Sequence, residues 1–192
     1  MPNKVSPPPD RITGDVWGLD LGRRTGWAFG KPGEVPQSGT WEFDGDLGDA
    51  CGGLLRNLQT AWKSSYPELV VAEAPLTLAA FLKLHSSEAN VQMHFGMHAI
   101  VRGLVSMWPR ARFVPANNAT VRKHFMGVGR MGTRELTKAA VIHRCQILGL
   151  VPRTQFDEDR CDAIAVQDWA AFTFGQRAAS ISQLVLTGEQ PR

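Results

Sequence analysis

Apolar residues in the first part of the chain fall into short extended runs separated by turn residues. Three such runs occupy positions 15–21, 25–29 and 39–43, with glycine-containing turns between them. This pattern predicts an antiparallel meander of three strands. A fourth run, at 69–72, is wholly apolar, which is typical of a central parallel strand covered on both faces, and a fifth short strand is expected at 112–115.

Helical periodicity fills the intervals between and after these strands. Apolar residues recur at helical spacing within 54–62, and either Asp46 or Asp49 is suited to cap that helix. Positions 87–107 predict a long helix with apolar residues on more than one side. Thr120 and Thr133 are placed to begin two further helices, and a last helix follows the acidic residues at 157–162. This order predicts an α/β fold with a mixed five-stranded sheet flanked by helices.

Composition limits the chain to one folded domain. Its 192 residues, 43% of them hydrophobic, suffice for one core and are too few for two. We expect a disordered proline-rich head at 1–12, a domain at 13–175 and a C-terminal tail at 176–192. No stretch approaches the roughly 20 apolar residues of a membrane span, so we expect a cytoplasmic protein without a membrane partner. Three cysteines without Cys-x-x-Cys spacing indicate neither a disulfide framework nor a structural zinc site.

Acidic residues interrupt the apolar pattern in three places. Asp20 lies within the first strand, Glu73 ends the fourth, and Asp159 and Asp162 begin the last helix. A carboxylate in an apolar strand is costly unless a cation neutralises it. The first and fourth strands would be neighbours in such a sheet, and residues three apart project from the same side of a helix. We therefore expect the four carboxylates to meet.

Four carboxylates at one place would repel one another strongly unless divalent cations lay among them. Hard ions suit an all-oxygen site, which predicts Mg²⁺, with Mn²⁺ as an alternative. Two such ions about 4 Å apart serve phosphodiester hydrolysis by activating water and stabilising the leaving oxygen. Asp157 and Glu158 compete with Asp159 for the fourth position. The structural alternatives are a solvated edge-strand residue or a turn-forming Asp before Gly22 for Asp20, and surface placement at a strand end for Glu73. For the helical pair the alternative is stabilisation by the helix dipole, of about 0.3–1 kcal/mol each.

Basic residues gather around a glycine-rich segment, Gly127-Val128-Gly129, where another backbone can approach closely. They could form a plain solvated surface, but their placement favours contact with nucleic-acid phosphates. The candidate DNA-binding residues are Arg122, Lys123, Arg130, Arg134 and Lys138. The net charge of +3 permits such a partner.

Several short motifs, taken in order, resemble those of a known family. They are Gly18-Leu19-Asp20-Leu21-Gly22 with Thr25-Gly26-Trp27-Ala28, then Val71-Ala72-Glu73, then Asp159-Arg160-Cys161-Asp162-Ala163-Ile164-Ala165. The combination is similar to the RuvC-type Holliday junction resolvases of the RNase H-like superfamily, and further similarity extends through 88–103 and 121–141. The proline-rich head and compact length resemble a phage or prophage member, which would act in the host cytoplasm.

The resemblance implies an RNase H-like fold and a Mg²⁺-dependent crossover junction endodeoxyribonuclease that leaves 5′-phosphate and 3′-hydroxyl ends. Its catalytic, metal-binding acids around two ions would be Asp20, Glu73, Asp159 and Asp162. The basic residues near its scissile phosphate would be Lys123, Lys138 and Arg122, which stands where the family often carries lysine. Paired symmetric nicks in a four-way junction would require a homodimer, and the apolar helix at 87–107 is the candidate surface for it.

Other functions remain open at this point. A YqgF-like RNA-processing nuclease would share the fold, and the sequence does not reveal the substrate sugar. Positions 20–26 also resemble the phosphate loop of actin- or sugar-kinase-like ATPases, although the short chain and the lack of a second such loop oppose that interpretation. A non-catalytic binding module is opposed by the retained acids. Junction preference is weakly indicated, because Ala74-Pro75-Leu76 stands where resolvases can carry an aromatic wedge, and Phe81 comes only later.

Overall fold

Five strands form one mixed sheet in the computed structural model, which describes residues 11–75, 77 and 87–175. β1 (Asp15–Asp20), β2 (Arg24–Gly30) and β3 (Gln37–Glu42) form the predicted antiparallel meander. β4 (Pro67–Glu73) pairs in parallel with β1, and β5 (Arg112–Ala116) pairs in parallel with β4. The strand order is β3-β2-β1-β4-β5, so the predicted adjacency of the first and fourth strands is confirmed. The predicted head through residue 10, the tail at 176–192 and Phe81 lie outside the described residues.

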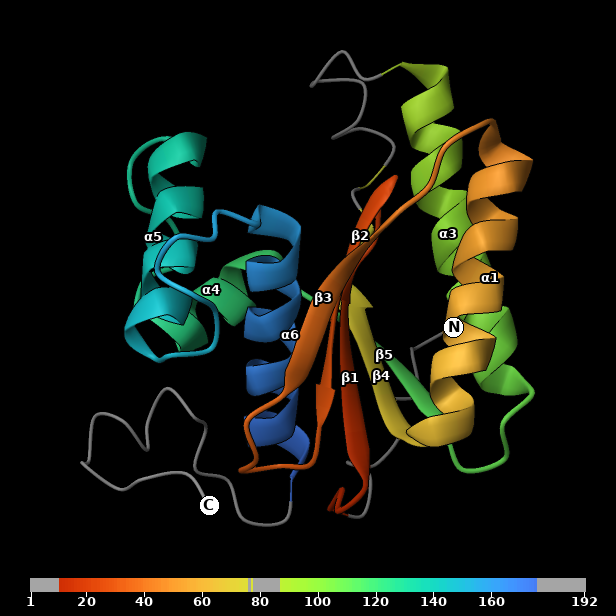
Figure 1. Ribbon diagram of the computed structural model, residues 1–192, viewed down its shortest axis with the longest axis horizontal. Helices are drawn as coiled ribbons and strands as arrows, with labels where there is room; N and C mark the ends of the chain where they lie inside the picture. The colour runs from red at the N-terminus through yellow and green to blue at the C-terminus, as the bar shows by residue number, and fades with distance from the viewer. Residues whose placement is uncertain (1–10, 76, 78–86, 176–192) are drawn as a thin grey trace, which may run out of the picture.

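Helices cover both faces of the sheet (Figure 1). α1 (Leu47–Ser64) and α3 (Glu88–Ser106) lie on one face. α6 (Glu158–Phe174) lies directly on the other, and α4 (Asn118–Met126) and α5 (Arg134–Ile147) pack against α6. No helix in the described part of the chain is both long and apolar enough to cross a membrane.

Side-chain caps explain where two of these helices begin. Asp46 caps α1 by accepting the N–H of Asp49 at 2.9 Å, while the Asp49 carboxylate accepts the N–H of Asp46 at 3.2 Å. Both candidate caps therefore act as one reciprocal pair. α4 begins earlier than predicted, because Asn117 is its cap and Thr120 supplies the N–H that the Asn117 side chain accepts.

Burial of both sheet faces accounts for the continuous apolar runs in β1 and β4. Alternate residues of β1 serve the two sides: Trp17 and Leu19 belong to the core beneath α1 and α3, whereas Val16 belongs to the core beneath α6. The second core extends to Ile12, which is fully buried and donates its N–H to the carbonyl oxygen of Phe174 at 2.8 Å. The packed chain therefore includes residue 12, which the sequence analysis had placed in the head.

Two glycines allow α6 to lie against the backbone of the sheet. A Cβ added to Gly26 of β2 would overlap the carbonyl oxygen of Asp159. A Cβ added to Gly18 of β1 would come within 2.5 Å of the carbonyl oxygen of Ala163 and the backbone nitrogen of Gln167. Because Gly26 is also the register partner of Asp20, this contact sets the first turn of α6 beside the end of β1.

A largely buried polar contact attaches α4 to α6. His124 Nε2 lies 3.0 Å from Asp168 Oδ2, and the two side chains are 10% and 3% exposed. The His124 ring also packs on Phe172, with 4.8 Å between ring centroids. The side chains that α4 carries are thereby held in a defined position relative to the first turns of α6.

We expect Gly26→Ala to destabilise the protein and to displace the start of α6. Its Cβ would occupy the position of the Asp159 carbonyl oxygen, and overpacking of this kind costs about 1–3 kcal/mol. Urea unfolding measures the effect. The matched control is Gly103→Ala in α3, where a Cβ meets nothing within 4 Å beyond the backbone of its own helix. That control should stabilise the protein by about 0.5–1 kcal/mol, and a similar gain for Gly26→Ala would contradict the close contact.

Candidate active site

Three acidic side chains lie near one another at the carboxyl edge of the parallel strands. Asp20 is the last residue of β1 and Glu73 is the last residue of β4, and these neighbouring strands run in the same direction. Asp162 comes from α6 and is 8% exposed. The charges of Glu73 and Asp162 both act on Asp20, which places the three carboxylates in one neighbourhood. We call these three residues the acidic cluster.

Burial opposes ionisation of every member of the acidic cluster. It is the largest cause that raises the pKa of Asp20 well above its usual value, and repulsion from Glu73, Asp162 and Asp159 adds to it. Burial, followed by the charge of Asp162, raises the pKa of Glu73 to about 7. Burial also raises the pKa of Asp162. The folded chain alone therefore stabilises the charges of the acidic cluster poorly.

Two of the predicted basic residues adjoin the acidic cluster. The ammonium group of Lys138 lowers the pKa of all three members, and it forms an ion pair with Glu158. A terminal guanidinium nitrogen of Arg122 lies 3.7 Å from Asp162 Oδ2. Arg122 Nε is buried and has no hydrogen-bond partner in the described part of the chain. These two cations oppose the effect of burial only in part, since all three pKa values stay raised.

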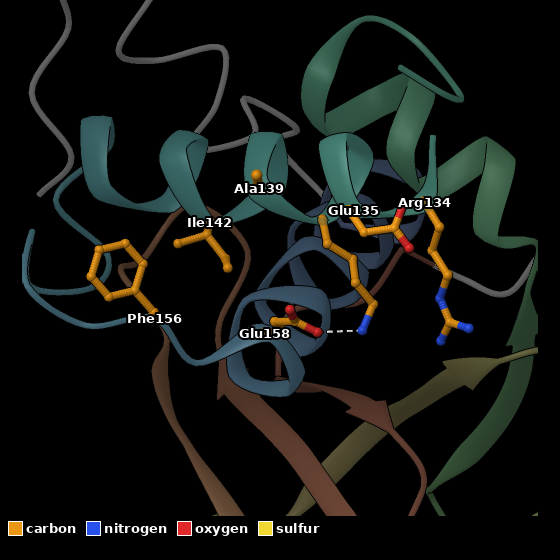
Figure 2. Close-up of a pocket in the computed structure, with 7 residues that line it drawn as sticks. Arg134, Glu135, Ala139, Ile142, Phe156 and Glu158 are labelled. Atoms are coloured by element: carbon orange, nitrogen blue, oxygen red, sulfur yellow. Dashed lines mark hydrogen bonds and ion pairs between the residues drawn. The ribbon is translucent and has the colours of Figure 1, made fainter. Parts of the chain in front are cut away.

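The other predicted basic residues are exposed. Arg134 lines an open pocket beside Lys138 (Figure 2), and Arg130 Nε donates to the carbonyl oxygen of Gly132 at 2.8 Å. Lys123 is on the surface of α4. Within the ranges that the structure describes, none of these three side chains forms an ion pair with the acidic cluster. Their predicted role in DNA binding rests on charge and position.

The residues that compete for the fourth acidic position differ in what they contact. Asp157 is the cap of α6, and its carboxylate accepts from Thr40 Oγ1 at 2.7 Å and from the N–H of Arg160 at 3.2 Å. Glu158 is paired with Lys138. Asp159 acts on the pKa of both Asp20 and Asp162. Asp159 therefore remains the best candidate, because the capping contacts already engage Asp157.

Two polar residues that the sequence analysis did not single out contact these acids. Arg24 of β2 donates from Nε to Asp159 Oδ2 at 2.8 Å and also pairs with Glu42 at 2.8 Å. Asn118 of α4 donates from Nδ2 to Glu73 Oε2 at 2.6 Å. Asn118 comes two residues after the end of β5, and this position just beyond a parallel strand is the signal that could have identified it. The pairing of Arg24 had no such signal, because it depends on how closely α6 approaches β2.

The donor chemistry of the acidic cluster fits a hard divalent cation. Mg²⁺ and Mn²⁺ prefer carboxylate oxygens, and a cation among the three carboxylates would offset the burial and the repulsion that raise their pKa values. As the side chains stand, no three acidic, histidine or cysteine residues within 11–75, 77 and 87–175 converge closely enough to hold one ion. Asp159 Oδ2 is paired with Arg24, so metal binding would require this carboxylate to exchange its partner, whereas the Asn118 hydrogen bond engages one oxygen of Glu73, Oε2.

We expect the free energy of unfolding of the metal-free protein to fall as the pH rises from about 4.5 to about 7, in part through Glu73. The pKa of this carboxyl is 4.5 in its ordinary state and about 7 in the folded protein. In that window the folded state holds the extra proton and unfolding releases it, so rising pH favours unfolding. Glu73→Gln, which can still accept from Asn118, should flatten the dependence and stabilise the protein at pH 8 by about 1–3 kcal/mol.

Urea titrations across this pH range, in the presence of a chelator, measure the effect. Glu34→Gln is the matched control, because Glu34 is an exposed loop residue away from the acidic cluster. Its pH dependence should follow that of the unmodified protein. A Glu73→Gln curve that also runs parallel to the unmodified protein would show that the Glu73 carboxyl is not a source of the dependence.

Solved structures that share this fold include Holliday junction resolvases. No protein-family model and no curated protein sequence matches the chain. RuvC from Thermus thermophilus superposes with a TM-score of 0.59 at 12% identity, covering 91% of this chain and 96% of RuvC. RuvC from the same organism in complex with a Holliday junction substrate gives a TM-score of 0.61 at 12% identity, covering 84% and 93%. The yeast mitochondrial Holliday junction resolvase Ydc2 gives 0.56 at 12% identity, covering 94% and 83%.

These comparisons bear on two of the predictions made from the sequence. They lend no support to a phage or prophage origin, since the three structures come from a bacterium and a yeast mitochondrion. They do confirm the expected architecture over nearly the whole described domain. The chain has the RNase H-like fold of the RuvC-type resolvases.

Proposed function

We propose that the protein is a Mg²⁺-dependent endodeoxyribonuclease, with Mn²⁺ as a possible substitute, that resolves Holliday junctions or related branched DNA. It would make paired symmetric nicks and leave 5′-phosphate and 3′-hydroxyl ends. The observation that carries the proposal is the acidic cluster, whose buried and half-buried carboxylates lie beside Arg122 and Lys138 at the carboxyl edge of the sheet. The choice of branched DNA is supported by the fold shared with RuvC, which has been solved in complex with a Holliday junction substrate.

Each polar residue of the site would have a distinct task. The ions would be held by the acidic cluster together with Asp159. When bound, two ions of this kind supply an activated water and stabilise the leaving oxygen in an in-line displacement. Arg24, whose side chain is 51% exposed, would swing away from Asp159 and free that carboxylate. Asn118 would hold Glu73 in position through its amide N–H.

The basic side chains would position the DNA and stabilise charge on the scissile phosphate. Arg122 and Lys138 lie beside the acidic cluster and present N–H donors on a flank where phosphate oxygens can approach. Donors held in place before the reaction stabilise the extra negative charge that develops during phosphoryl transfer. Lys123, Arg130 and Arg134 would contact the DNA backbone farther from the nick, with an affinity that falls as salt concentration rises.

We expect the purified protein to nick a labelled four-way junction at symmetric positions when Mg²⁺ is present and to be inactive with chelator. Asp20→Asn should lower the cleavage rate by at least about 10²-fold, because it removes an anionic ligand of the ions, and loss of even the outer partners of metal ligands costs about 10–100-fold. The matched control is Asp44→Asn, an exposed acid in the loop after β3. Gel analysis of junction, fork, linear duplex, RNA–DNA hybrid and RNA substrates measures activity and substrate choice.

Other outcomes of that assay would select other functions. If Asp20→Asn cleaves as fast as the unmodified protein, the acidic cluster is not the active site. Cleavage confined to RNA would favour the RNA-processing alternative, and ATP hydrolysis without nuclease activity would favour the kinase-like alternative. Junction binding without cleavage in any divalent cation would favour a non-catalytic binding module.

A homodimer remains part of the proposal, because two symmetric nicks require two active sites related by a two-fold axis. The helix predicted at 87–107 leaves fewer apolar side chains exposed than its sequence suggested. Met93, Met97 and Val101 of α3 are buried in the core that α1 and the sheet share. The large apolar side chains that α3 and its cap leave exposed are Phe95 at 42% and Met107 at 73%.

We expect the unmodified protein to sediment as a dimer and Phe95→Asp to shift it toward monomer. A buried, unpaired carboxylate would oppose association at this surface. Val35→Asp is the matched control, since Val35 is 52% exposed in the loop between β2 and β3. Analytical ultracentrifugation with and without junction DNA makes the measurement. A protein that stays monomeric under both conditions would exclude the dimer, and a dimer that persists in Phe95→Asp would place the interface elsewhere.

A further inference from the structure

An open pocket of about 460 Å³ lies between α5 and the start of α6 (Figure 2). This volume falls in the range of small-ligand pockets. One end is apolar and the other is charged: Figure 2 shows Phe156 and Ile142 together at one end and Arg134 at the other. The lining residues are Arg134, Glu135, Lys138, Ala139, Ile142, Phe156 and Glu158.

Phe156 is the most exposed large apolar side chain among the described residues, at 77%. It lies in the segment just before α6 and faces Ile142 of α5 across the apolar end of the pocket (Figure 2). The Phe156 ring contributes little to the core, because most of the surface of the ring is in solvent. An exposed aromatic ring in a pocket that cationic side chains also line is the combination that single-stranded nucleic-acid sites use to stack bases and hold the backbone.

The pocket adjoins the proposed active site. Lys138 lines the pocket, and its charge acts on Asp20, Glu73 and Asp162. Glu158, another lining residue, is next in sequence to Asp159. A DNA strand with a phosphate at the acidic cluster would therefore place a neighbouring nucleotide at the mouth of the pocket.

The charges of the pocket indicate which part of that nucleotide enters. Two carboxylates, Glu135 and Glu158, line the pocket and disfavour a phosphate inside it. Carboxylates do accept hydrogen bonds from the N–H groups on base edges. Arg134, at the opposite end from Phe156, is placed to bind a phosphate at the rim (Figure 2). A base inside and a phosphate at the rim thus match both the apolar and the charged parts of the lining.

We propose that this pocket receives the base of the nucleotide next to the scissile phosphate, stacked on Phe156, with Arg134 on the adjoining phosphate. The inference rests on the proposed nuclease function. A base can enter only after it leaves the duplex stack, which costs a few kcal/mol in intact duplex and least where the nucleotide is already unpaired. Nucleotides at a branch point meet this requirement most easily. The pocket therefore gives the protein a physical means to prefer branched DNA over linear duplex.

Binding measurements in chelator, after the nick position has been mapped with Mg²⁺, test the proposal. Phe156→Ala should weaken four-way-junction binding roughly tenfold, the usual effect of removing one stacking ring, and Phe156→Trp should retain binding. Linear duplex binding should change less than twofold. The control is Ile147→Ala, which removes another exposed apolar side chain, 56% exposed, from the far end of α5. Thermal melts verify that each variant is folded. We expect both to fold, because Phe156 and Ile147 are exposed and contribute little to the core.

Photo-crosslinking identifies the base directly. 5-Iodouracil, placed in turn at each position within two nucleotides of the nick, should crosslink to Phe156 at one adjacent position, as mapped by mass spectrometry. No crosslink to Phe156 at any of these positions, or equal weakening of junction and duplex binding by Phe156→Ala, would overturn the base pocket while the nuclease proposal stands. If the unmodified protein neither binds nor nicks branched DNA, the proposed function fails and the base pocket fails with it.

Discussion

The close contact between α6 and the backbone of β1 and β2 is the constraint on which the rest of the site depends. Gly18 and Gly26 leave no side chain between the helix and these strands, so backbone atoms of α6 approach to a distance that any Cβ would prevent. The same contact brings Asp162 toward the strand-end acids. α4 is attached to α6 through His124 and Asp168 and carries Arg122 to the site, while α5 packs on α6 and carries Lys138. The packing of α6 against β1 and β2 therefore brings the acidic and the cationic side chains of the site together.

The acidic cluster works against the stability that this packing creates. Burial raises the pKa of Asp20, Glu73 and Asp162, repulsion from neighbouring carboxylates adds to it, and Arg122 and Lys138 compensate only in part. A residue set chosen for stability alone would contain amides or apolar side chains here. Unfavourable charges in a well-packed fold are the kind of local conflict that functional sites retain. The hydrogen bonds from Arg24 and Asn118 satisfy individual carboxylates without cancelling the repulsion.

The sequence predicted the sheet well, because strands buried on both faces must be apolar throughout and their turns require glycine. It also predicted that Asp20 and Glu73 would be neighbours, since both end strands that pair in parallel. It did not predict the contact of Arg24 with Asp159 or the pocket that Phe156 lines, because both depend on how elements pack: β2 against the start of α6 in one case, and α5 beside the segment before α6 in the other. The apolar surface that α3 leaves exposed was overestimated, since a helix packed against both α1 and the sheet buries more than one of its sides.

The central claim is that the acidic cluster and Asp159 hold divalent cations between the end of β1, the end of β4 and the start of α6. Crystals soaked in Mn²⁺ and measured at the manganese absorption edge test it most directly, because anomalous scattering locates the ions independently of the protein. The account predicts two peaks about 4 Å apart among Asp20, Glu73, Asp159 and Asp162, with Asp159 released from Arg24. The absence of any peak there at millimolar Mn²⁺, with the Arg24–Asp159 pair intact, would contradict it.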